Sequence, residues 1–440
     1  MGRIRWTPAG LALAGLALAG LALAVGLLPA GASAAAKPKS LSIAVVTFFS
    51  GSGGVVGGPS VNSARLTIDA INHAGGIDGV PIVARYVDES GGPTKNVAEF
   101  RSLAPDVAAI VGYVSSGDCL AVAPVADELK RLTIFSDCTT NALFEGHSYQ
   151  WVFRTQPPAS TNALAMALYI AKTHPHLKSI AGINQDYAFG RDEWKYFSEA
   201  MGVLEPGIKV GPSLFPALFS GHYTSEISRL LGASPALIYS SLWGGDVVAL
   251  IQQGQAQGMF QSSLVALSLG TQGGIEGLKA LPDNVIVGSE NSYLLHPGKI
   301  ADSQLAGFVD TYRKRFGEYP ASTYPYTVRR SILTLWDAYL AAISKNDGKW
   351  PSDSEVAKAL VGLKVKTLLG TMEMRSDHQG TFEERVGISV HSSDYPFAVF
   401  NKIVIFPADM IMPPVGETAE KWIATLTPKM LDAVPAPHQY

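Results

Sequence analysis

Two short turns rich in hydroxyl side chains are the places where this chain is best equipped to hold a small molecule. One contains Ser115 and Ser116, and the other contains Cys138, Thr139 and Thr140. Each turn follows an apolar run and precedes a helical pattern, so its hydroxyl and backbone N–H groups lie at the start of a helix. Such a position suits a carboxylate or another acceptor-rich group. Any one of these residues could serve only as a helix N-cap, but two adjacent turns favour a binding site.

Two further turns, in the second half of the chain, place an aromatic ring beside glycine. They are Asp186-Tyr187-Ala188-Phe189-Gly190 and Leu242-Trp243-Gly244-Gly245-Asp246. We expect the rings of Phe189 and Trp243 to close over a flat or apolar solute, because they sit in turns and do not follow the spacing of a helical core face. The alternative is that these rings point inward and belong to the core.

The two cysteines of the chain, Cys119 and Cys138, lie in or next to the hydroxyl-rich turns. Neighbouring parallel strands are about 4.8 Å apart, so two turns at the same sheet edge can come within bridging range. A disulfide closing a loop of about 20 residues would contribute roughly 3 kcal/mol. Two unpaired buried thiols are the alternative. An exported chain with two cysteines fits a disulfide better than a metal site.

The sequence lacks the common signatures of nucleotide binding and catalysis. Gly51, Gly53 and Gly57 follow a strand but miss the dinucleotide spacing by one residue. There is no phosphate-binding Gly-Lys-Ser/Thr, no Gly-x-Ser-x-Gly elbow and no His-Glu-x-x-His, and the nine histidines are scattered. We therefore predict no catalytic residues, no metal site and no cofactor, and a protein that is not an enzyme.

The N-terminal segment predicts export. Arg3 and Arg5 precede an apolar run that reaches about residue 28, and Ala32-Ser33-Ala34 is typical of a signal-peptide cleavage site. A transmembrane anchor is the alternative, because the apolar run approaches the length that spans a bilayer. We predict that residues 1–34 form a signal peptide, cleaved near Ala34, and that the mature protein is periplasmic.

The charge of the mature chain argues against nucleic acid as a partner. Without the two leader arginines, 32 basic residues remain against 37 acidic ones, and they form no basic stripe.

Strand-like and helix-like segments alternate along the rest of the chain, which is typical of α/β folds with parallel sheets. The expected strands are 41–47, 81–87, 107–113, 132–135, 179–184, 209–215, 236–241 and 263–268, followed by strands within 387–406. The expected helices begin near Pro59 and cover 95–103, 120–130, 191–200, 224–231, 247–255, 304–316 and 327–343. The pattern restarts beyond Arg154, so we predict two lobes of similar architecture, connected by ordered hinges.

The order of several motifs resembles the leucine/isoleucine/valine-binding family, the type I periplasmic solute-binding proteins of branched-chain amino acid ABC transporters. The resemblance spans roughly residues 41–410. It rests on Ile43-Ala44-Val45-Val46, Ser50-Gly51, Asp69-Ala70-Ile71-Asn72, Gly75-Gly76-Ile77, Asp88, Val152-Phe153-Arg154-Thr155, the Asp186–Gly190 turn and Phe316-Gly317.

This resemblance implies two doubly wound parallel-sheet lobes that close on a ligand and are joined by three hinge crossovers, near Thr155, Ser289 and Gly370. Lobe 1 would comprise residues 40–155 and 290–369, lobe 2 residues 156–289 and 370–412, and residues 413–440 a C-terminal tail.

The resemblance also assigns ligand contacts. Ser116 and Thr140 would hold a ligand carboxylate with the backbone of Cys138, and Phe189 and Leu242 or Trp243 would supply rings or apolar contacts from lobe 2. Two positions depart from the family: Val56 replaces a tryptophan, and Leu269 falls where amino-acid binders carry the acidic residue that holds the ammonium group.

A buried ammonium needs a compensating charge, so an apolar or aromatic carboxylate, or an amide-like solute, fits this site better than an ordinary amino acid. Asp118 or Asp137 could still supply the charge from lobe 1. The implied function is a monomeric receptor that captures a small organic solute for an inner-membrane ABC permease. A ligand-sensing regulator of the same fold is an alternative. So is an exported hydrolase using the Ser115/Ser116 turn, which would need a histidine such as His222 or His296 beside it.

Overall fold

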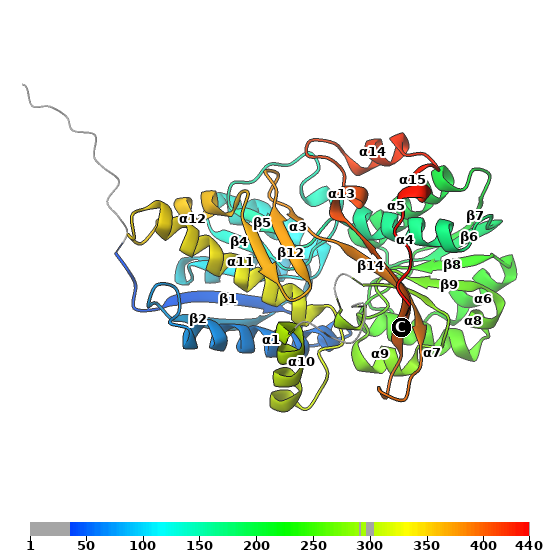
Figure 1. The fold of residues 1–440 in the computed structure, drawn as a ribbon, viewed down its shortest axis with the longest axis horizontal. Coiled ribbons are helices and arrows are strands. Elements are labelled where there is room, and N and C mark those ends of the chain that lie inside the picture. The colour runs from blue at the N-terminus through cyan, green and yellow to red at the C-terminus, as the bar shows by residue number, and fades with distance from the viewer. Residues whose placement is uncertain (1–35, 290–291, 296–302, 440) are drawn as a thin grey trace, which may run out of the picture. The chain divides into compact units, whose positions relative to one another are not determined.

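The computed structural model describes residues 36–289, 292–295 and 303–439. The predicted signal peptide, residues 1–34, lies outside these described residues. Within them, no helix combines the length and apolar character needed to cross a bilayer. Two large sheets and one small sheet organise the chain (Figure 1).

Lobe 1 is built on a five-stranded sheet of order β2-β1-β3-β4-β5 in which every neighbouring pair is parallel. Its strands are β1 (Leu41–Thr47), β2 (Ile82–Asp88), β3 (Ala109–Gly112), β4 (Leu132–Phe135) and β5 (Val152–Arg154). All residues of β3, β4 and β5 are buried. These short apolar runs are therefore covered by helices on both faces, as is usual for parallel sheets.

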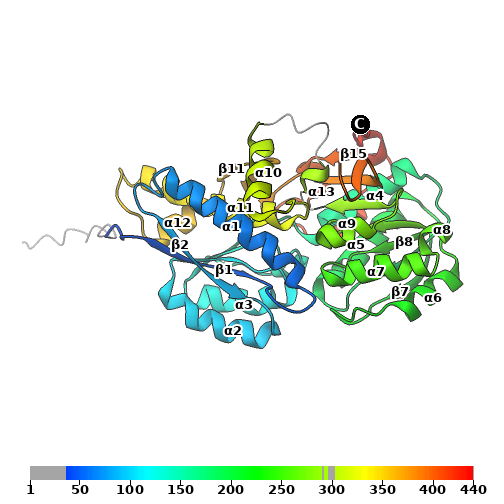
Figure 2. The same ribbon diagram turned by 90° about the horizontal axis from the view of Figure 1, so that it is seen from below.

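Helices cover both faces of this sheet because β2 and β3 lie on opposite sides of β1. Right-handed crossovers then place the connecting helices on opposite faces, and Figure 2 shows α2 and α3 on the other side of β1 from α1. On one face α1 packs against α11, and on the other α2 packs against α3. These helices are α1 (Gly54–His73), α2 (Gly92–Leu103), α3 (Ser116–Glu128) and α11 (Tyr324–Lys345).

Lobe 2 is built on a seven-stranded sheet of order β15-β14-β10-β9-β8-β6-β7. The strands β6 to β10 are parallel, whereas β14 and β15 run antiparallel at one edge. The strands are β6 (Ser179–Ile183), β7 (Lys209–Leu214), β8 (Leu237–Ser240), β9 (Leu264–Leu267), β10 (Ile286–Ser289), β14 (Glu384–Val390) and β15 (Val399–Phe406). The second lobe is thus a mixed sheet, parallel only in its βα units.

Six helices belong to the βα part of lobe 2. They are α4 (Ala159–Thr173), α5 (Ala188–Leu204), α6 (Thr224–Ala233), α7 (Gly245–Ala256), α8 (Met259–Ser262) and α9 (Gly274–Ala280). Residues 159–171 of α4 are all buried. They pack between α5 and the sheet, which accounts for the nearly continuous apolar sequence of that helix.

The chain passes between the two large sheets three times. It leaves the first sheet after β5, returns between β10 and α11, and rejoins the second sheet at β14. Before that last passage, β11 (Lys364–Thr367), β12 (Gly370–Met374) and β13 (Gly380–Thr381) form a separate antiparallel sheet. The predicted crossover near Gly370 therefore falls on a strand that pairs with β11 and β13, and the strand pairing favours a passage between β13 and β14.

Shorter and C-terminal elements complete the described chain. They are η1 (Ala104–Asp106), η2 (Asn141–Leu143), η3 (Tyr293–Leu295), α10 (Ser303–Phe316), α12 (Asp353–Leu360), α13 (Ala408–Ile411), α14 (Ala419–Thr425) and α15 (Met430–Ala433). The predicted tail contains α14, which packs on α5, and α15, which packs on α4. It is thus attached to lobe 2 through apolar contacts.

One helix begins earlier than expected. The sequence predicted a start near Pro59, but α1 begins at Gly54 and includes that proline. Pro59 is the sixth residue of α1, beyond the first turn, so it cannot donate the helical N–H to the carbonyl of Val55. The Gly-rich segment is therefore partly helical.

Candidate ligand-binding site

A small cavity lies between the two lobes and is lined by residues of both. Lobe 1 contributes Val114, Ser116, Asp137, Thr139 and Tyr324, and lobe 2 contributes Tyr187, Phe189, Trp243, Leu269 and Gln272. All except Tyr324 follow the carboxyl ends of strands, where open parallel sheets bind their ligands.

Four helices begin at or next to this cavity. Ser116 is the first residue of α3, Phe189 the second of α5, and Tyr324 the first of α11, while Trp243 lies two residues before α7. Each helix N-terminus carries a partial positive charge from its aligned peptide dipoles. The helix N-termini therefore favour an anionic or acceptor-rich group, while the lining side chains include no cation and one carboxyl group, that of Asp137.

An aromatic wall joins the lobes around Trp243. Its indole Nε1 donates a hydrogen bond to the Tyr187 hydroxyl at 2.7 Å. Its ring centroid lies 5.1 Å from that of Phe219 and 5.8 Å from that of Phe48, which comes from the segment after β1 in lobe 1. Phe189 and Trp243 are each only 2% exposed. Because Phe189 lines the cavity and packs in the same cluster, the rings act as both core and cavity wall.

Two polar contacts between the lobes border the cavity. The backbone N–H of Gly245 donates to the Ser52 carbonyl at 3.0 Å. The Tyr324 hydroxyl on α11 donates to Oε1 of Gln272 in lobe 2 at 2.7 Å. Gly244 precedes the first contact with φ +62°, and a Cβ there would approach the Ser52 oxygen to 3.1 Å. Glycine at this turn allows the close approach of the two lobes.

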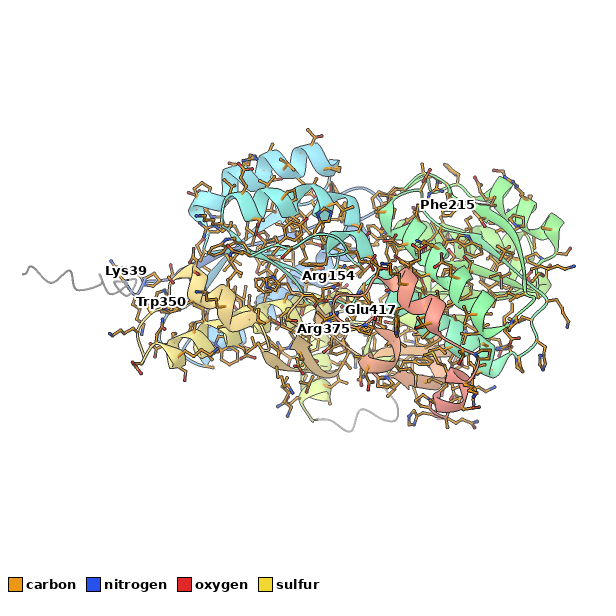
Figure 3. The ribbon with its side chains drawn as sticks, turned by 90° about the horizontal axis from the view of Figure 1, so that it is seen from above. Lys39, Arg154, Phe215, Trp350, Arg375 and Glu417 are labelled. Atoms are coloured by element: carbon orange, nitrogen blue, oxygen red, sulfur yellow. A yellow bond between two sulfur atoms is a disulfide. The ribbon has the colours of Figure 1, made fainter. Side chains whose placement is uncertain are left out.

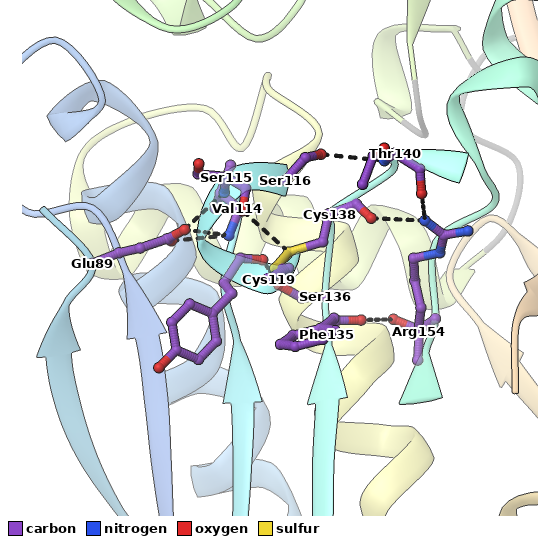
Figure 4. The surroundings of a disulfide bond; sticks show 12 residues. Glu89, Val114, Ser115, Ser116, Cys119, Phe135, Ser136, Cys138, Thr140 and Arg154 are labelled. Carbon is purple, nitrogen blue, oxygen red and sulfur yellow. Dashed lines mark hydrogen bonds between the residues drawn. A yellow bond between two sulfur atoms is a disulfide. The ribbon is translucent and has the colours of Figure 1, made fainter. Parts of the chain in front are cut away.

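A fully buried carboxyl group, that of Glu89, accepts hydrogen bonds from the first hydroxyl-rich turn (Figure 4). Glu89 accepts hydrogen bonds from the backbone N–H of Val114, at 2.9 and 3.0 Å to its two oxygens, and of Ser115, at 2.7 Å. Burial raises the pKa of Glu89 well above its usual range, and the charge of Asp118 raises it further, while the two N–H groups oppose this shift. Glu89 thus orders the turn that presents Ser116.

A disulfide between Cys119 and Cys138 connects the two hydroxyl-rich turns, with 6.1 Å between the Cα atoms (Figure 4). Cys119 lies in the first turn of α3, and Cys138 follows β4 with a left-handed backbone, φ +68°. The backbone N–H of Thr140 donates to Oγ of Ser116 at 3.2 Å, which joins the same two turns a second time.

The hydroxyl of Thr140 does not line the cavity. It donates to Oδ2 of Asp192 at 2.6 Å, and the backbone N–H of Asn141 donates to the same oxygen at 2.9 Å. Asp192 belongs to α5 of lobe 2, so this carboxylate occupies the Thr140 hydroxyl that the family resemblance had assigned to a ligand. Burial raises the pKa of Asp192.

The buried guanidinium of Arg154 holds the second turn in place. Its Nη1 donates to the carbonyl oxygens of Cys138 at 2.7 Å and of Thr140 at 2.8 Å, and its Nη2 donates to Gln379. Burial lowers the pKa of Arg154 to about 10, against the opposing charges of Asp377, Asp137 and Asp192. In Figure 3 Arg154 lies near Arg375, whose backbone N–H donates to the Gln379 carbonyl at 2.9 Å. A single cation therefore links the β5 crossover to the site.

The structure brings together five of the eight predicted contacts. Ser116, Thr139, Phe189, Trp243 and Leu269 line the cavity, whereas Ser115, Cys138 and Thr140 stand behind it. Ser115 and Cys138 act through their backbones, since Ser115 donates its N–H to Glu89 and Cys138 offers its carbonyl to Arg154. Cys138 is also committed to the disulfide.

Sequence reasoning did not assign four cavity residues. Val114 and Tyr187 lie in turns that the sequence analysis had predicted to bind the ligand, so their position in these turns could have identified them. Gln272 follows Leu269 by three residues in the same turn, which connects β9 to α9. Tyr324 has no local signal, because it reaches the cavity only through the return of the chain to lobe 1. Asp137 lines the cavity at the position considered for a compensating charge.

The described residues offer little for metal or hydrolytic chemistry. Within residues 36–289, 292–295 and 303–439, no three His, Cys, Asp or Glu side chains are grouped to hold a metal ion. No histidine is among the residues that line the cavity, His222 is exposed, and His296 lies outside the described residues. The hydrolase alternative thus gains no support from the site.

Two α/β lobes joined by three crossovers, with a small cavity between them, define a type I periplasmic binding protein. A model of the periplasmic binding protein family matches residues 40–387, and the chain belongs to this family. A Leu/Ile/Val-binding protein homologue of Brucella melitensis is 26% identical over 247 residues, which is 54% of this chain and 63% of that protein. The Leu/Ile/Val/Thr-binding protein of Salmonella typhimurium is 23% identical over 76% of this chain and 86% of its own length.

Solved structures share the fold. An ABC transporter solute-binding protein of Rhodopseudomonas palustris, in complex with 3,4-dihydroxybenzoic acid, has a TM-score of 0.73 at 19% identity and covers 86% of this chain and 99% of its own. A branched-chain amino acid transporter binding protein of Streptococcus pneumoniae, in complex with isoleucine, has a TM-score of 0.67 at 19% identity, with 79% and 96% coverage.

Proposed function

We propose that this protein is the exported solute receptor of an ABC importer and that it captures a small organic carboxylate by closing its two lobes. The observation that carries the proposal is the convergence of four helix N-termini on one cavity lined from both lobes. That environment favours an anion without requiring a cationic side chain.

The walls of the cavity favour a flat or apolar ligand body. Four aromatic side chains line the cavity: Tyr187, Phe189, Trp243 and Tyr324. Aromatic rings bind flat solutes by stacking or by edge contacts.

Among carboxylates, an aromatic or apolar acid is favoured over an amino acid. Leu269 lines the lobe 2 wall, and the lining residues of that lobe include no carboxylate that could hold an ammonium group. Asp137 lines the lobe 1 wall, where its charge interacts with the buried Arg154. The binding of a dihydroxybenzoic acid by one structural neighbour and of isoleucine by another makes both classes necessary in any test.

The proposal extends to the cellular setting. The protein would be exported to the periplasm with cleavage near Ala34, would act as a monomer, and would deliver its ligand to an inner-membrane ABC permease. Its lobes would comprise residues 40–155 and 290–369, and residues 156–289 and 370–412, with the strand pairing of 370–374 favouring a slightly later boundary. Neither a cofactor nor a nucleic acid takes part.

A thermal-shift screen tests this function. The mature protein is refolded to remove carried-over ligand and then heated with benzoate, 4-hydroxybenzoate, 3,4-dihydroxybenzoate, aliphatic acids, leucine, isoleucine or amides. A ligand at 100 times its Kd stabilises the native state by about 2.7 kcal/mol, so a melting shift with one or more acids is expected. Shifts with leucine and isoleucine alone would contradict the aromatic or apolar preference. No shift with any carboxylate would contradict the receptor for organic acids.

A further inference from the structure

The contact between Asp192 and the second hydroxyl-rich turn crosses from one lobe to the other. Asp192 is the fifth residue of α5 in lobe 2, whereas Thr140 and Asn141 belong to lobe 1. One carboxylate oxygen accepts both the Thr140 hydroxyl, at 2.6 Å, and the Asn141 backbone N–H, at 2.9 Å. Asn141 begins η2, so the carboxylate caps this short helix from the opposite lobe.

The contact occupies the Thr140 hydroxyl, which the family resemblance had assigned to a ligand carboxylate. Charge-assisted hydrogen bonds of this length are the stronger ones in proteins. Partial burial of the Asp192 carboxyl raises its pKa, so its desolvation is compensated only while the two donors remain in place. The contact is therefore sensitive to separation of the lobes.

The same turn is tied to the cavity on the lobe 1 side. The backbone N–H of Thr140 donates to Oγ of Ser116, a cavity residue, and the Thr140 carbonyl accepts from Arg154 at the β5 crossover. Thr140 is therefore hydrogen-bonded to Asp192 of lobe 2, to Ser116 in the cavity wall and to Arg154 at the β5 crossover. The position of this threonine thus depends on whether the two lobes are closed.

Other charged groups surround this junction. Glu145 accepts from the Asn141 side chain at 3.0 Å and from the backbone N–H of Ala419 at 2.7 Å, which brings the start of α14 to the same place. Lys195, one turn after Asp192 on α5, pairs with Glu420 at 2.6 Å. The C-terminal segment therefore borders the contact without forming it.

We propose that Asp192 is a positioning residue that acts as a latch between the two lobes. Its carboxylate accepts hydrogen bonds from the Thr140 hydroxyl and the Asn141 N–H, which favours the closed arrangement before a ligand binds. Ser116, Thr139 and the helix N-termini remain available to the ligand carboxylate. This inference rests on the proposed receptor function only in its reference to a ligand.

Small-angle X-ray scattering of the refolded, ligand-free protein tests the latch. Asp192→Ala removes the acceptor from lobe 2, and Thr140→Val removes the hydroxyl donor from lobe 1. Each variant is expected to shift the radius of gyration upward relative to the unsubstituted protein, because the population of open molecules increases. Circular dichroism confirms that each variant is folded, and the two substitutions come from opposite lobes in case one of them fails to fold.

Glu199→Ala is the matched control. Glu199 lies about two helical turns after Asp192 on α5, and its electrostatic neighbours are Lys195 and Glu420. It should scatter like the unsubstituted protein. Asp192→Asn keeps an acceptor oxygen of the same reach but loses the charge, and should open less than Asp192→Ala. The Asp192→Ala/Thr140→Val double variant should open no further than Asp192→Ala.

Equal radii for the unsubstituted protein, Asp192→Ala and Thr140→Val would overturn the latch. Additive opening in the double variant, or full opening in Asp192→Asn, would overturn it as well, because the two groups would then act separately or through charge alone. Since no ligand is present, these outcomes are independent of the thermal-shift screen. A protein that binds no carboxylate would leave the scattering result intact and would contradict only the proposed function.

Discussion

At the scale of single residues, the apolar side chain of Leu269 lies in the cavity wall close to Gln272, and the lobe 2 lining contains no carboxylate. Leu269→Glu would introduce an acceptor for an ammonium group. We expect it to tighten the binding of leucine and isoleucine by about tenfold or more, since a hydrogen bond to a charged group contributes roughly 1.5–3 kcal/mol. Binding of 4-hydroxybenzoate should weaken through repulsion.

Isothermal titration calorimetry with both ligand classes measures this change. Leu269→Gln, which has the same length without the charge, is the control and should not gain amino-acid binding. Unchanged selectivity in Leu269→Glu would show that Leu269 does not face the ligand.

The adjacent serines Ser115 and Ser116 offer a second comparison at this scale. Ser116 lines the cavity and accepts the Thr140 N–H through its side chain, whereas Ser115 stands behind the wall and donates its backbone N–H to Glu89. Ser116→Ala should weaken carboxylate binding by about 1.5–3 kcal/mol, the range for a lost hydrogen bond to a charged group. Ser115→Ala should bind within about twofold of the unsubstituted protein. Equal losses in the two variants would contradict the placement of the ligand.

At the scale of secondary-structure elements, the disulfide connects the start of α3 to the turn after β4 across a sequence separation of 19. Cys119→Ser/Cys138→Ser, or reduction of the native protein, should lower the free energy of unfolding by about 3 kcal/mol in the chain-entropy model. Because the bridge also holds both hydroxyl-rich turns, carboxylate affinity should fall in parallel.

Urea denaturation with and without reductant measures the effect. The unfolding midpoint of the double serine variant should not change when reductant is added, so this variant is the control for effects of the reductant itself. A native protein whose unfolding midpoint is unchanged by complete reduction would contradict a stabilising role of this bridge.

At the scale of the whole molecule, buried acids make stability depend on pH. Burial raises the pKa of Glu89 and Asp118 in the folded chain. Such a group still holds its proton in the folded state at a pH where the unfolded chain, with carboxyl pKa values of about 4, has lost it. The free energy of unfolding should therefore fall as the pH rises from about 4 toward the raised pKa values of Glu89 and Asp118 in the folded state.

Melting temperatures between pH 4.5 and 8 measure this dependence. Glu89→Gln, which cannot ionise, should show a flatter pH profile than the unsubstituted protein. The pKa of Asp88 is lowered to about 2 by hydrogen bonds from Phe49, Ser90 and Ser50 that outweigh its desolvation, so its opposite contribution is lost only below pH 4 and lies outside this window. Equal slopes for both proteins would contradict the assignment to Glu89.

The sequence by itself determined the α/β class, the two lobes and the turns at which a ligand would be held. These features depend on local patterns: apolar runs such as 41–47 and 132–135 form strands, and small polar residues follow where helices begin. Turn position also placed Ser116, Thr139, Phe189 and Trp243 at the cavity, because residues at the carboxyl ends of parallel strands meet at one sheet edge, while Leu269 was placed by the family resemblance.

Only the tertiary structure decided which side chains face the ligand. Thr140 belongs to the predicted turn, yet its hydroxyl points to Asp192, 52 positions later in the chain. Tyr324 reaches the cavity through the return of the chain from lobe 2, and Arg154 reaches Gln379 across 225 positions. The direction of a side chain depends on rotamer choice and on neighbours supplied by distant segments, and these are set only when the two lobes pack together.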